Sequence, residues 1–310
     1  MTEDPPAPAP ITTLLHRARR RETPCGDGTL VWHVWDPQPG QASQPLAPVV
    51  LLHGGSGSWT HWVANINALV GAGHQVLAAD LPGFGDSARP ARGRDADALV
   101  APLDAGLALL LANGPHQQVD LVGFSFGGLT AGLWARALPA RIRQLVVVGA
   151  PGLGVSTRGA VPLAGWRHLR DPGEVLQVHR GNLAALMLRH PESITALALW
   201  IHAANVTRDR MPGRRLAHTE ALKDALPHIT CPVAAIYGRA DALYQGLHEG
   251  LALALSSAHD FRGLHWVEDA GHWVQFERAA QFDTLLAAVL RKGAVTRDGP
   301  SVGGAAYLAT

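Results

Sequence analysis

The amino-acid sequence predicts an α/β protein in which helices cover both faces of a mostly parallel β-sheet. Short runs rich in valine, leucine and alanine alternate along the chain with longer segments that carry apolar residues at helical spacing. Several of these runs are continuously apolar, and such strands are buried on both faces, as in a parallel sheet between two helix layers. The chain has 310 residues, of which 47% are hydrophobic and 16% charged, enough to bury a substantial core.

The predicted strands are short and apolar, and some of them run directly into glycine. In chain order they are residues 48–55, 74–80, 118–124, 142–151, 231–238 and 264–269. The predicted helices are the longer segments between and after these strands, at residues 61–73, 97–114, 127–139, 243–257 and 275–292. Gly71 and Gly73 suit the end of the first helix, and Pro102 indicates a kink or a late start in the second.

The alternation of strand and helix stops at residues 152–226, where helical runs occur without a convincing strand. An all-helical insertion predicts a cap, or lid, over the sheet, and it leaves residues 25–151 and 227–292 as the core. Residues 1–24 are rich in proline, and residues 293–310 are rich in glycine and alanine without periodicity. The first segment is predicted to be a flexible arm and the second a flexible tail.

Net charge and cysteine content indicate which kinds of partner and which cellular compartment to expect. The formal net charge is +1, which gives no electrostatic reason to expect nucleic acid as a partner. No stretch approaches the roughly 18 apolar residues that span a membrane, and the first residues lack the apolar core of a signal peptide. Cys25 and Cys231 are too few for a disulfide framework and have no metal-binding spacing. We expect a cytoplasmic protein that acts on a small molecule and binds neither a metal nor a membrane. The sequence leaves open whether the protein forms a homo-oligomer.

The stretch "LVGFSFGG" at residues 121–128 places Ser125 between Gly123 and Gly127. It lies where an apolar strand passes into a helix, the setting of a nucleophile elbow, in which a strained bend exposes the serine oxygen. Small residues are needed on both sides because a Cβ there would collide with the neighbouring strand or helix. A strand that simply ends in a turn is the alternative and explains the context less well. Ser125 is therefore the candidate nucleophile.

A second glycine-rich segment, "LLHGGSGSW", follows another apolar strand. A phosphate-binding loop would carry the lysine of GxxxxGK[ST], which is absent, so neither a nucleotide nor another cofactor is expected. The segment can instead supply a backbone N–H to an oxyanion, since glycine lets the backbone approach a substrate closely. We expect Gly55 to provide one such donor and Phe126, which follows the nucleophile, to provide the other.

Five short motifs, "HGG", "DLPGFGDS", "GFSFGG", "GRAD" and "GHW", occur in the order found in α/β-hydrolase-fold enzymes. The chain resembles this family over about residues 28–292. The resemblance implies the α/β-hydrolase fold, an eight-stranded, mostly parallel sheet with a helical cap inserted after the sixth strand. Haloalkane dehalogenases and epoxide hydrolases of this fold carry an aspartate where this chain has Ser125, which argues against both.

The same resemblance orders the remaining catalytic groups, because this family places the acid and then the histidine after the serine. His272 in "DAGHWVQF" follows the last predicted strand and is the candidate base for Ser125. Asp241 in "GRAD" comes directly after a strand and before a helix, and is the candidate acid that orients His272. The turn after the sixth strand, "VVVGAPGLG", has no carboxylate, and Glu268 and Asp269 lie too near His272 along the chain.

A closer similarity is to bacterial hydrolases that cleave carbon–carbon bonds in ring-fission products of aromatic catabolism. "LLHGGSGSWTHW" and "GHWVQFE" resemble their sequences, including Trp273 after the histidine. The chain departs from them at Phe124 and Phe126, where they usually carry asparagine and methionine. They also use a cap arginine to hold the carboxylate of the dienoate, and Arg189 is the candidate for that role. The two phenylalanines favour a hydrophobic or aromatic substrate.

The favoured reaction is hydrolysis of a carboxylic ester through an acyl-enzyme, with Ser125, His272 and Asp241 as the catalytic triad. Cleavage of a carbon–carbon bond in a vinylogous diketone uses the same groups and is the alternative. A ligand-binding protein without turnover is a third hypothesis, although no member of the triad is replaced. Trp166 and Trp200 in the cap are further candidates for substrate binding.

Overall fold

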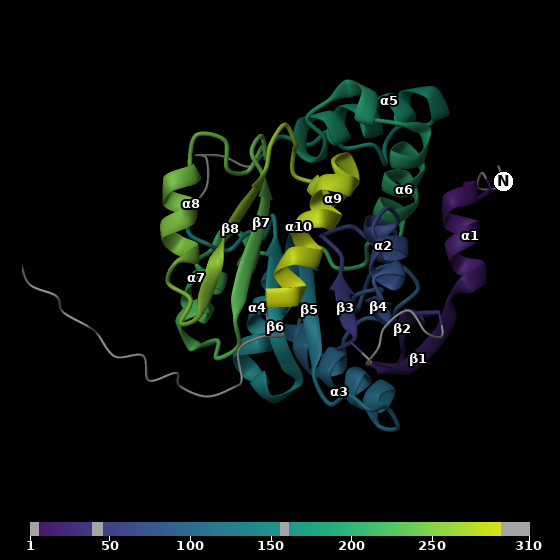
Figure 1. The fold of residues 1–310 in the computed structure, drawn as a ribbon. Coiled ribbons are helices and arrows are strands. Elements are labelled where there is room, and N and C mark those ends of the chain that lie inside the picture. The colour runs from purple at the N-terminus through teal and green to yellow at the C-terminus, as the bar shows by residue number, and fades with distance from the viewer. Residues whose placement is uncertain (1–5, 39–45, 156–160, 293–310) are drawn as a thin grey trace, which may run out of the picture.

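A computed structural model describes residues 6–38, 46–155 and 161–292 of the chain (Figure 1). Its centre is an eight-stranded sheet in the order β1-β2-β4-β3-β5-β6-β7-β8. β1 and β2 pair antiparallel, β2 also pairs antiparallel with β4, and all pairs among β3 to β8 are parallel. The strands are β1 (Arg19–Cys25), β2 (Gly28–Trp35), β3 (Val49–Leu52), β4 (Val76–Ala79), β5 (Val119–Phe124), β6 (Ile142–Val148), β7 (Val233–Gly238) and β8 (Phe261–Val267). This is the sheet that the family resemblance implies.

Helices cover both faces of the sheet (Figure 1). They are α1 (Ala9–Arg17), α2 (Ile66–Gly71), α3 (Val100–Leu111), α4 (Phe126–Ala137), α5 (Pro172–Asn182), α6 (Ala196–Thr207), α7 (Ala221–Ala225), α8 (His248–Leu255), α9 (Val274–Glu277) and α10 (Ala279–Lys292). Alternate residues of a strand point to opposite faces. In β3, Val50 and Leu52 join the core cluster that contains α3 and α4, whereas Val49 and Leu51 join the cluster of α2 and α10. Burial on both faces explains why β3 is continuously apolar.

Three predicted helices are divided, and one begins late. The segment 97–114 divides into a 3-10 turn at Ala96–Leu99 and α3, so the α-helix itself starts at Val100. The segment 61–73 divides into a 3-10 turn at Trp59–Trp62 and α2, because the hydroxyl of Ser58 accepts from Thr60 N and starts a separate turn. The segment 275–292 divides into α9 and α10 at Arg278, whose φ of −129° and ψ of 52° lie outside the helical region. In the segment 243–257, α8 begins only at residue 248.

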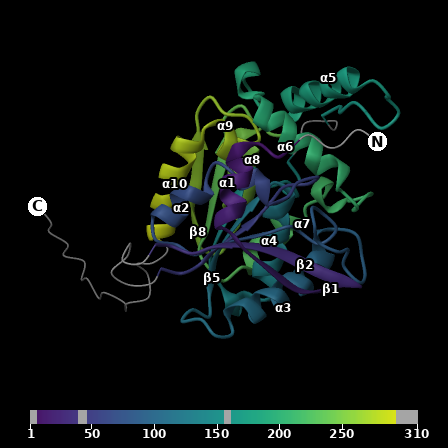
Figure 2. The same ribbon diagram turned by 90° about the vertical axis from the view of Figure 1, so that its right-hand side faces the viewer.

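The prediction of a flexible arm over residues 1–24 is wrong from residue 6 onward. Proline at the start of α1 sets a helical φ and costs no hydrogen bond there, so it begins a helix. Ile11 and Leu14 are buried, and the indole N–H of Trp35 donates to Leu14 O at 2.9 Å. β1 then pairs with β2 along its whole length. Figure 2 views the molecule from the edge that α1 and β1 form.

The region between β6 and β7 is helical, and no strand occurs among its described residues. Figure 1 shows α5 and α6 at the top of the molecule, near α9, whereas α7 lies lower beside α8. Leu222 of α7 is fully buried in the core cluster that contains α4. A Cβ added at Gly132 of α4 would lie 2.2 Å from Leu222 Cδ1, so the two helices are in close contact. The cap predicted over residues 152–226 therefore ends with a helix that packs on the core.

Residues 293–310, predicted as a flexible tail, lie outside the described residues. Within the described ranges, no helix is long and apolar enough to cross a membrane. The cytoplasmic location stays a prediction, and so does the possible formation of a homo-oligomer.

His33 in β2 is a buried histidine without a polar partner. It is 4% exposed, it lies against the rings of Trp35 and Trp59, and neither ring nitrogen has a hydrogen-bond partner in the described part of the chain. Burial is the main cause that lowers the pKa of His33 from 6.5 to about 4. The folded protein therefore binds this proton less readily than the unfolded chain does, and stability is lost as the pH falls from about 6.5 towards 4.

Replacing His33 with phenylalanine is expected to remove about 3 kcal/mol of that acid sensitivity. The free energy of unfolding, measured in denaturant at pH 8 and at pH 4.5, should differ less in His33→Phe than in the wild type. The exposed His16→Gln is the matched control and should keep the wild-type difference. An unchanged difference in His33→Phe would contradict the assignment of a buried neutral imidazole.

Candidate active site

Ser125 lies on a sharp bend between β5 and α4. Its φ of 50° and ψ of −120° are strained for a residue with a side chain, and its N–H donates to Val148 O at 2.7 Å. A Cβ added at Gly123 would lie 2.4 Å from Gly127 O, and one added at Gly127 would lie 2.4 Å from His53 O. Both distances are far below van der Waals contact, so the bend requires glycine at these two positions for the reason given from the sequence.

Three side chains from separate loops meet at this bend. His272 follows β8, and its Nε2 lies 2.9 Å from Ser125 Oγ. Its Nδ1 lies 2.8 Å from Oδ2 of Asp241, which follows β7. Asp241 is fully buried and His272 is 2% exposed. Because β5, β7 and β8 are parallel, their carboxyl ends lie at one edge of the sheet, and the three residues predicted as a triad come together there.

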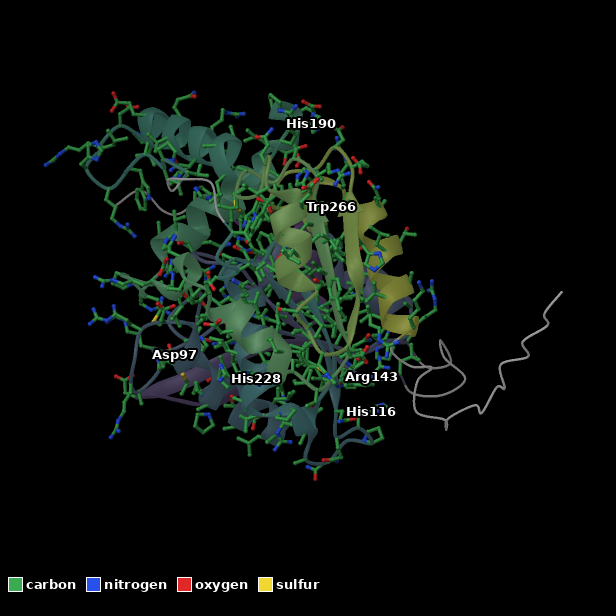
Figure 3. All side chains as sticks on the ribbon, turned by 90° about the vertical axis from the view of Figure 1, so that its left-hand side faces the viewer. Asp97, His116, Arg143, His190, His228 and Trp266 are labelled. Carbon is green, nitrogen blue, oxygen red and sulfur yellow. The ribbon has the colours of Figure 1, made fainter. Side chains whose placement is uncertain are left out.

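The loop that carries His272 is held by contacts with the cap. Glu277 of α9 accepts the N–H of Gly271 at 2.6 Å and the N–H of His190 at 2.8 Å. The imidazole of His190, labelled in Figure 3, also pairs with Asp269 at 2.8 Å. Sequence reasoning missed Glu277, although it is the last residue of the "GHWVQFE" motif.

The two residues expected to donate to an oxyanion lie side by side. Phe126 is the first residue of α4, so its N–H is at the positive end of a helix. A Cβ added at Gly55 would lie 3.6 Å from Phe126 Cβ. Among the described residues, neither N–H donates to another protein atom, whereas Gly54 N–H donates to His61 Nδ1 at 3.2 Å. The N–H groups of Gly55 and Phe126 are thus free to donate to a substrate.

Two buried histidines hold the loop before Gly55. Nδ1 of His53 lies 2.7 Å from Gly54 O, and its Nε2 accepts the N–H of Leu81 at 2.8 Å. His61 accepts from Gly54 N–H, so both polar groups of Gly54 are engaged. Burial is the main cause that lowers the pKa of His53 to about 4 and the pKa of His61 well below its usual range. Both rings are therefore neutral at pH 7 and can accept these hydrogen bonds.

A cavity of about 660 Å³ opens at the bend. Its lining includes Ser125, His272, Gly55, Phe124 and Phe126. The remaining lining is mostly apolar, with residues such as Leu153, Val155, Leu186, Met187, Met211 and Leu243.

Four residues predicted to contact the substrate are absent from this lining, which corrects that expectation. Trp273 is 1% exposed, and its ring stacks on that of Phe276 with the two centroids 4.2 Å apart. It therefore packs inside the protein and stabilises the loop that carries His272. Arg189 is exposed to solvent. Trp166 packs against His179 at 5.2 Å, and Trp200 is also outside the lining.

Arg214 is the arginine of the cavity lining, and sequence reasoning missed it. Its Nη1 and Nη2 each lie 2.9 Å from a different carboxylate oxygen of Asp209. Burial alone would raise the pKa of Asp209, but hydrogen bonds from Arg214 and Ser56 lower it below its ordinary value. One signal was present in the sequence, the charged stretch "RDRMPGR" at residues 208–214, which follows a predicted cap helix. A local sequence pattern does not show which residues this stretch contacts. Within the described ranges, no group of three potential metal ligands comes together.

Comparison with known proteins gives the family. Residues 47–215 match the family model described as alpha/beta hydrolase fold. The chain is 33% identical to a 2-hydroxymuconate semialdehyde hydrolase from Pseudomonas sp. (strain CF600), over 77% of this chain and 85% of that protein. It is 28% identical to a 2-hydroxy-6-oxo-6-phenylhexa-2,4-dienoate hydrolase from Comamonas testosteroni, over 79% of this chain and 87% of that protein.

Solved structures with the same fold include esterases. An esterase from Rhodococcus sp. ECU1013 superposes with a TM-score of 0.68 at 24% identity, covering 88% of this chain and 98% of that one. The structure of a putative aryl esterase from Burkholderia cenocepacia superposes with a TM-score of 0.67 at 20% identity, covering 89% and 99%. The sheet, the elbow and these matches together show that the chain belongs to the alpha/beta hydrolase fold family and is a hydrolase.

Proposed function

We propose that the protein hydrolyses carboxylic esters of hydrophobic or aromatic small molecules through an acyl-enzyme on Ser125. The observation that carries the proposal is the chain of hydrogen bonds from Ser125 Oγ through His272 to Asp241. Ser125 and His272 also line a cavity whose other residues are mostly apolar. A serine hydroxyl becomes a useful nucleophile only when a base takes its proton, and Nε2 of His272 is within reach to do so.

The reaction then follows from the positions of these groups. Ser125 Oγ attacks the ester carbonyl carbon while His272 takes its proton, and Asp241 holds the imidazole in the required tautomer. The N–H groups of Gly55 and Phe126 stabilise the charge on the carbonyl oxygen. His272 donates the proton to the leaving alcohol, which gives the acyl-enzyme. Water, deprotonated by His272, attacks the acyl group and releases the acid and Ser125.

The ion pair between Arg214 and Asp209 favours a neutral ester as the substrate over a dienoate that carries a carboxylate. Both Nη atoms of Arg214 already bind Asp209, so a substrate carboxylate would have to compete with a bound carboxylate for the same donors. The rest of the described lining holds no lysine and no other arginine that could pair with a substrate carboxylate. Carbon–carbon cleavage of a vinylogous diketone is the second candidate, and the observation that favours it is the similarity to hydrolases named for dienoate substrates.

A substrate panel separates the two reactions. The wild type, Ser125→Ala and the matched control Ser256→Ala are assayed with 4-nitrophenyl esters of increasing acyl length, with 1-naphthyl acetate and with 2-hydroxy-6-oxo-6-phenylhexa-2,4-dienoate. We expect rapid ester turnover in the wild type and in Ser256→Ala, and slow or no turnover of the dienoate. Fast dienoate turnover with negligible ester turnover would replace the proposal with the second candidate. No turnover of either class, with binding of the compounds, would favour the ligand-binding hypothesis.

A further inference from the structure

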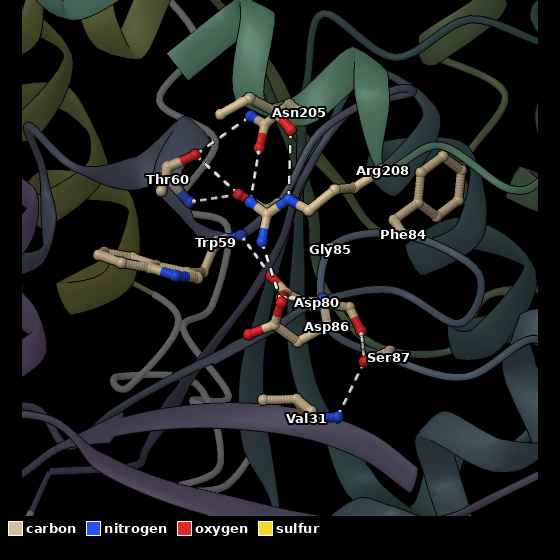
Figure 4. Close-up of polar contacts among 12 residues, drawn as sticks. Val31, Trp59, Thr60, Asp80, Phe84, Gly85, Asp86, Ser87, Asn205 and Arg208 are labelled. Carbon is tan, nitrogen blue, oxygen red and sulfur yellow. Dashed lines mark hydrogen bonds and ion pairs between the residues drawn. The ribbon is translucent and has the colours of Figure 1, made fainter. Parts of the chain in front are cut away.

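The segment that follows α6 in the cap lies directly on the core. We call residues 208–214 the cap anchor. Arg208 Nη1 lies 2.9 Å from Asp86 Oδ1, and the N–H of Arg210 donates to Gly83 O at 2.9 Å. Figure 4 shows Arg208 between Asn205 of the cap and the core residues Asp80 and Asp86. The cap anchor is thus attached to the turn "DLPGFGDS" by several polar contacts.

The same segment also reaches the loop that carries Gly55. Ser56, the next residue, has a φ of 48°, which is unfavourable for a residue with a side chain. Its hydroxyl donates to Oδ2 of Asp209 at 2.6 Å. A backbone held in this region needs contacts from its surroundings, and Asp209 supplies one from the cap.

Asp209 is itself fixed by its neighbours. Its Oδ1 accepts from Met211 N–H at 2.9 Å, and both of its oxygens bind Arg214. The guanidinium of Arg214 lies over the rings of Phe84 and Phe126, at 5.0 and 5.3 Å from their centroids. A Cβ added at Gly55 would lie 3.6 Å from Arg214 Nη2. The network of Asp209 and Arg214 therefore contacts both expected oxyanion donors, Gly55 through the next residue, Ser56, and Phe126 through its ring.

We propose that Asp209 is a positioning residue, which fixes the N–H of Gly55 through the hydroxyl of Ser56 and makes the cap anchor part of the oxyanion site. The inference rests on the proposed function, because it assumes that an oxyanion forms beside Ser125. Donors to an oxyanion are effective only when they are held in place before the charge develops. Asp209 acts on the donor and does not touch the substrate.

The test compares Asp209→Ala, Ser56→Gly and the control Asp86→Ala with the wild type. Asp86→Ala removes the ion pair with Arg208 and leaves Ser56 untouched, whereas Ser56→Gly removes the hydroxyl and permits the positive φ. The readouts are the second-order rate of Ser125 labelling by a fluorophosphonate, and kcat and KM for an aryl ester. The phosphonyl oxygen occupies the oxyanion site during labelling, so labelling reports on that site without requiring ester turnover.

We expect Asp209→Ala and Ser56→Gly to lower the labelling rate and kcat by about 10- to 100-fold, with KM within about twofold of the wild type. Asp86→Ala should label at nearly the wild-type rate. Labelling of both test variants at the wild-type rate, or losses confined to KM, would overturn the inference. If Asp209→Ala does not fold, the labelling rate of Ser56→Gly alone supports or overturns the inference.

The two hypotheses fail in different ways. A wild type that is labelled but does not hydrolyse esters refutes the proposed ester reaction, while the labelling rates of the variants still test the role of Asp209. A wild type that is not labelled at Ser125 refutes both.

Discussion

Replacing Ser125 with alanine is expected to lower kcat for an aryl ester by about 10⁶-fold, close to the rate that binding and the oxyanion donors alone can sustain. Without Oγ there is no nucleophile 2.9 Å from His272 and no acyl-enzyme. Alanine removes a single oxygen, so the unfolding temperature should stay close to that of the wild type. The measurement is kcat on the best ester of the panel, with unfolding followed by circular dichroism.

The control for this prediction is Ser256→Ala, an exposed serine whose hydroxyl bonds only to Leu253 O in the described structure. It should retain wild-type kcat. Activity of Ser125→Ala within about 100-fold of the wild type, in a preparation free of contaminating esterase, would show that another group performs the chemistry.

Replacing Asp241 with asparagine is expected to lower kcat by about 10⁴-fold. The carboxylate accepts from His272 Nδ1 at 2.8 Å and from Leu243 N–H at 2.9 Å. An amide of the same shape can turn its NH₂ group towards Nδ1, which then carries no proton and leaves Nε2 protonated. His272 in that tautomer cannot accept the proton of Ser125. The charge of the imidazolium that forms during reaction also loses its buried counter-ion.

The measurement is the pH profile of kcat for Asp241→Asn, with the exposed Asp224→Asn as the matched control. A variant that depends on the wrong tautomer should regain part of its activity at high pH, where hydroxide can replace the missing base. Asp224→Asn should follow the wild-type profile. A loss of less than about tenfold in Asp241→Asn would mean that another acid orients His272.

Much of the core could be predicted from local patterns because its constraints are local. A strand between two helix layers must be apolar throughout, and the bend at Ser125 leaves no room for a Cβ at Gly123 or Gly127. Family order then assigned His272 and Asp241 from the ends of later strands, and the parallel sheet brings those ends together.

The cap could not be predicted to the same depth because its contacts are non-local. Trp166 is a predicted substrate-binding residue, yet its ring packs against His179 of the cap. Arg189 and Arg214 look alike in sequence, and only packing places the second beside Phe126. The same holds for Ser56, whose positive φ depends on a carboxylate 153 positions away. The prolines of the first segment suggested an arm, although Ile11 and Leu14 bury α1 against the core.

The most direct test of the account is the mass of the enzyme during turnover of an ester that deacylates slowly. The reaction is stopped with acid, and the intact protein and its peptides are weighed. The account predicts an added mass equal to one acyl group, located at Ser125 in the wild type and absent from Ser125→Ala. Steady turnover with no acyl group on the protein, or an acyl group on another residue that persists in Ser125→Ala, would contradict it.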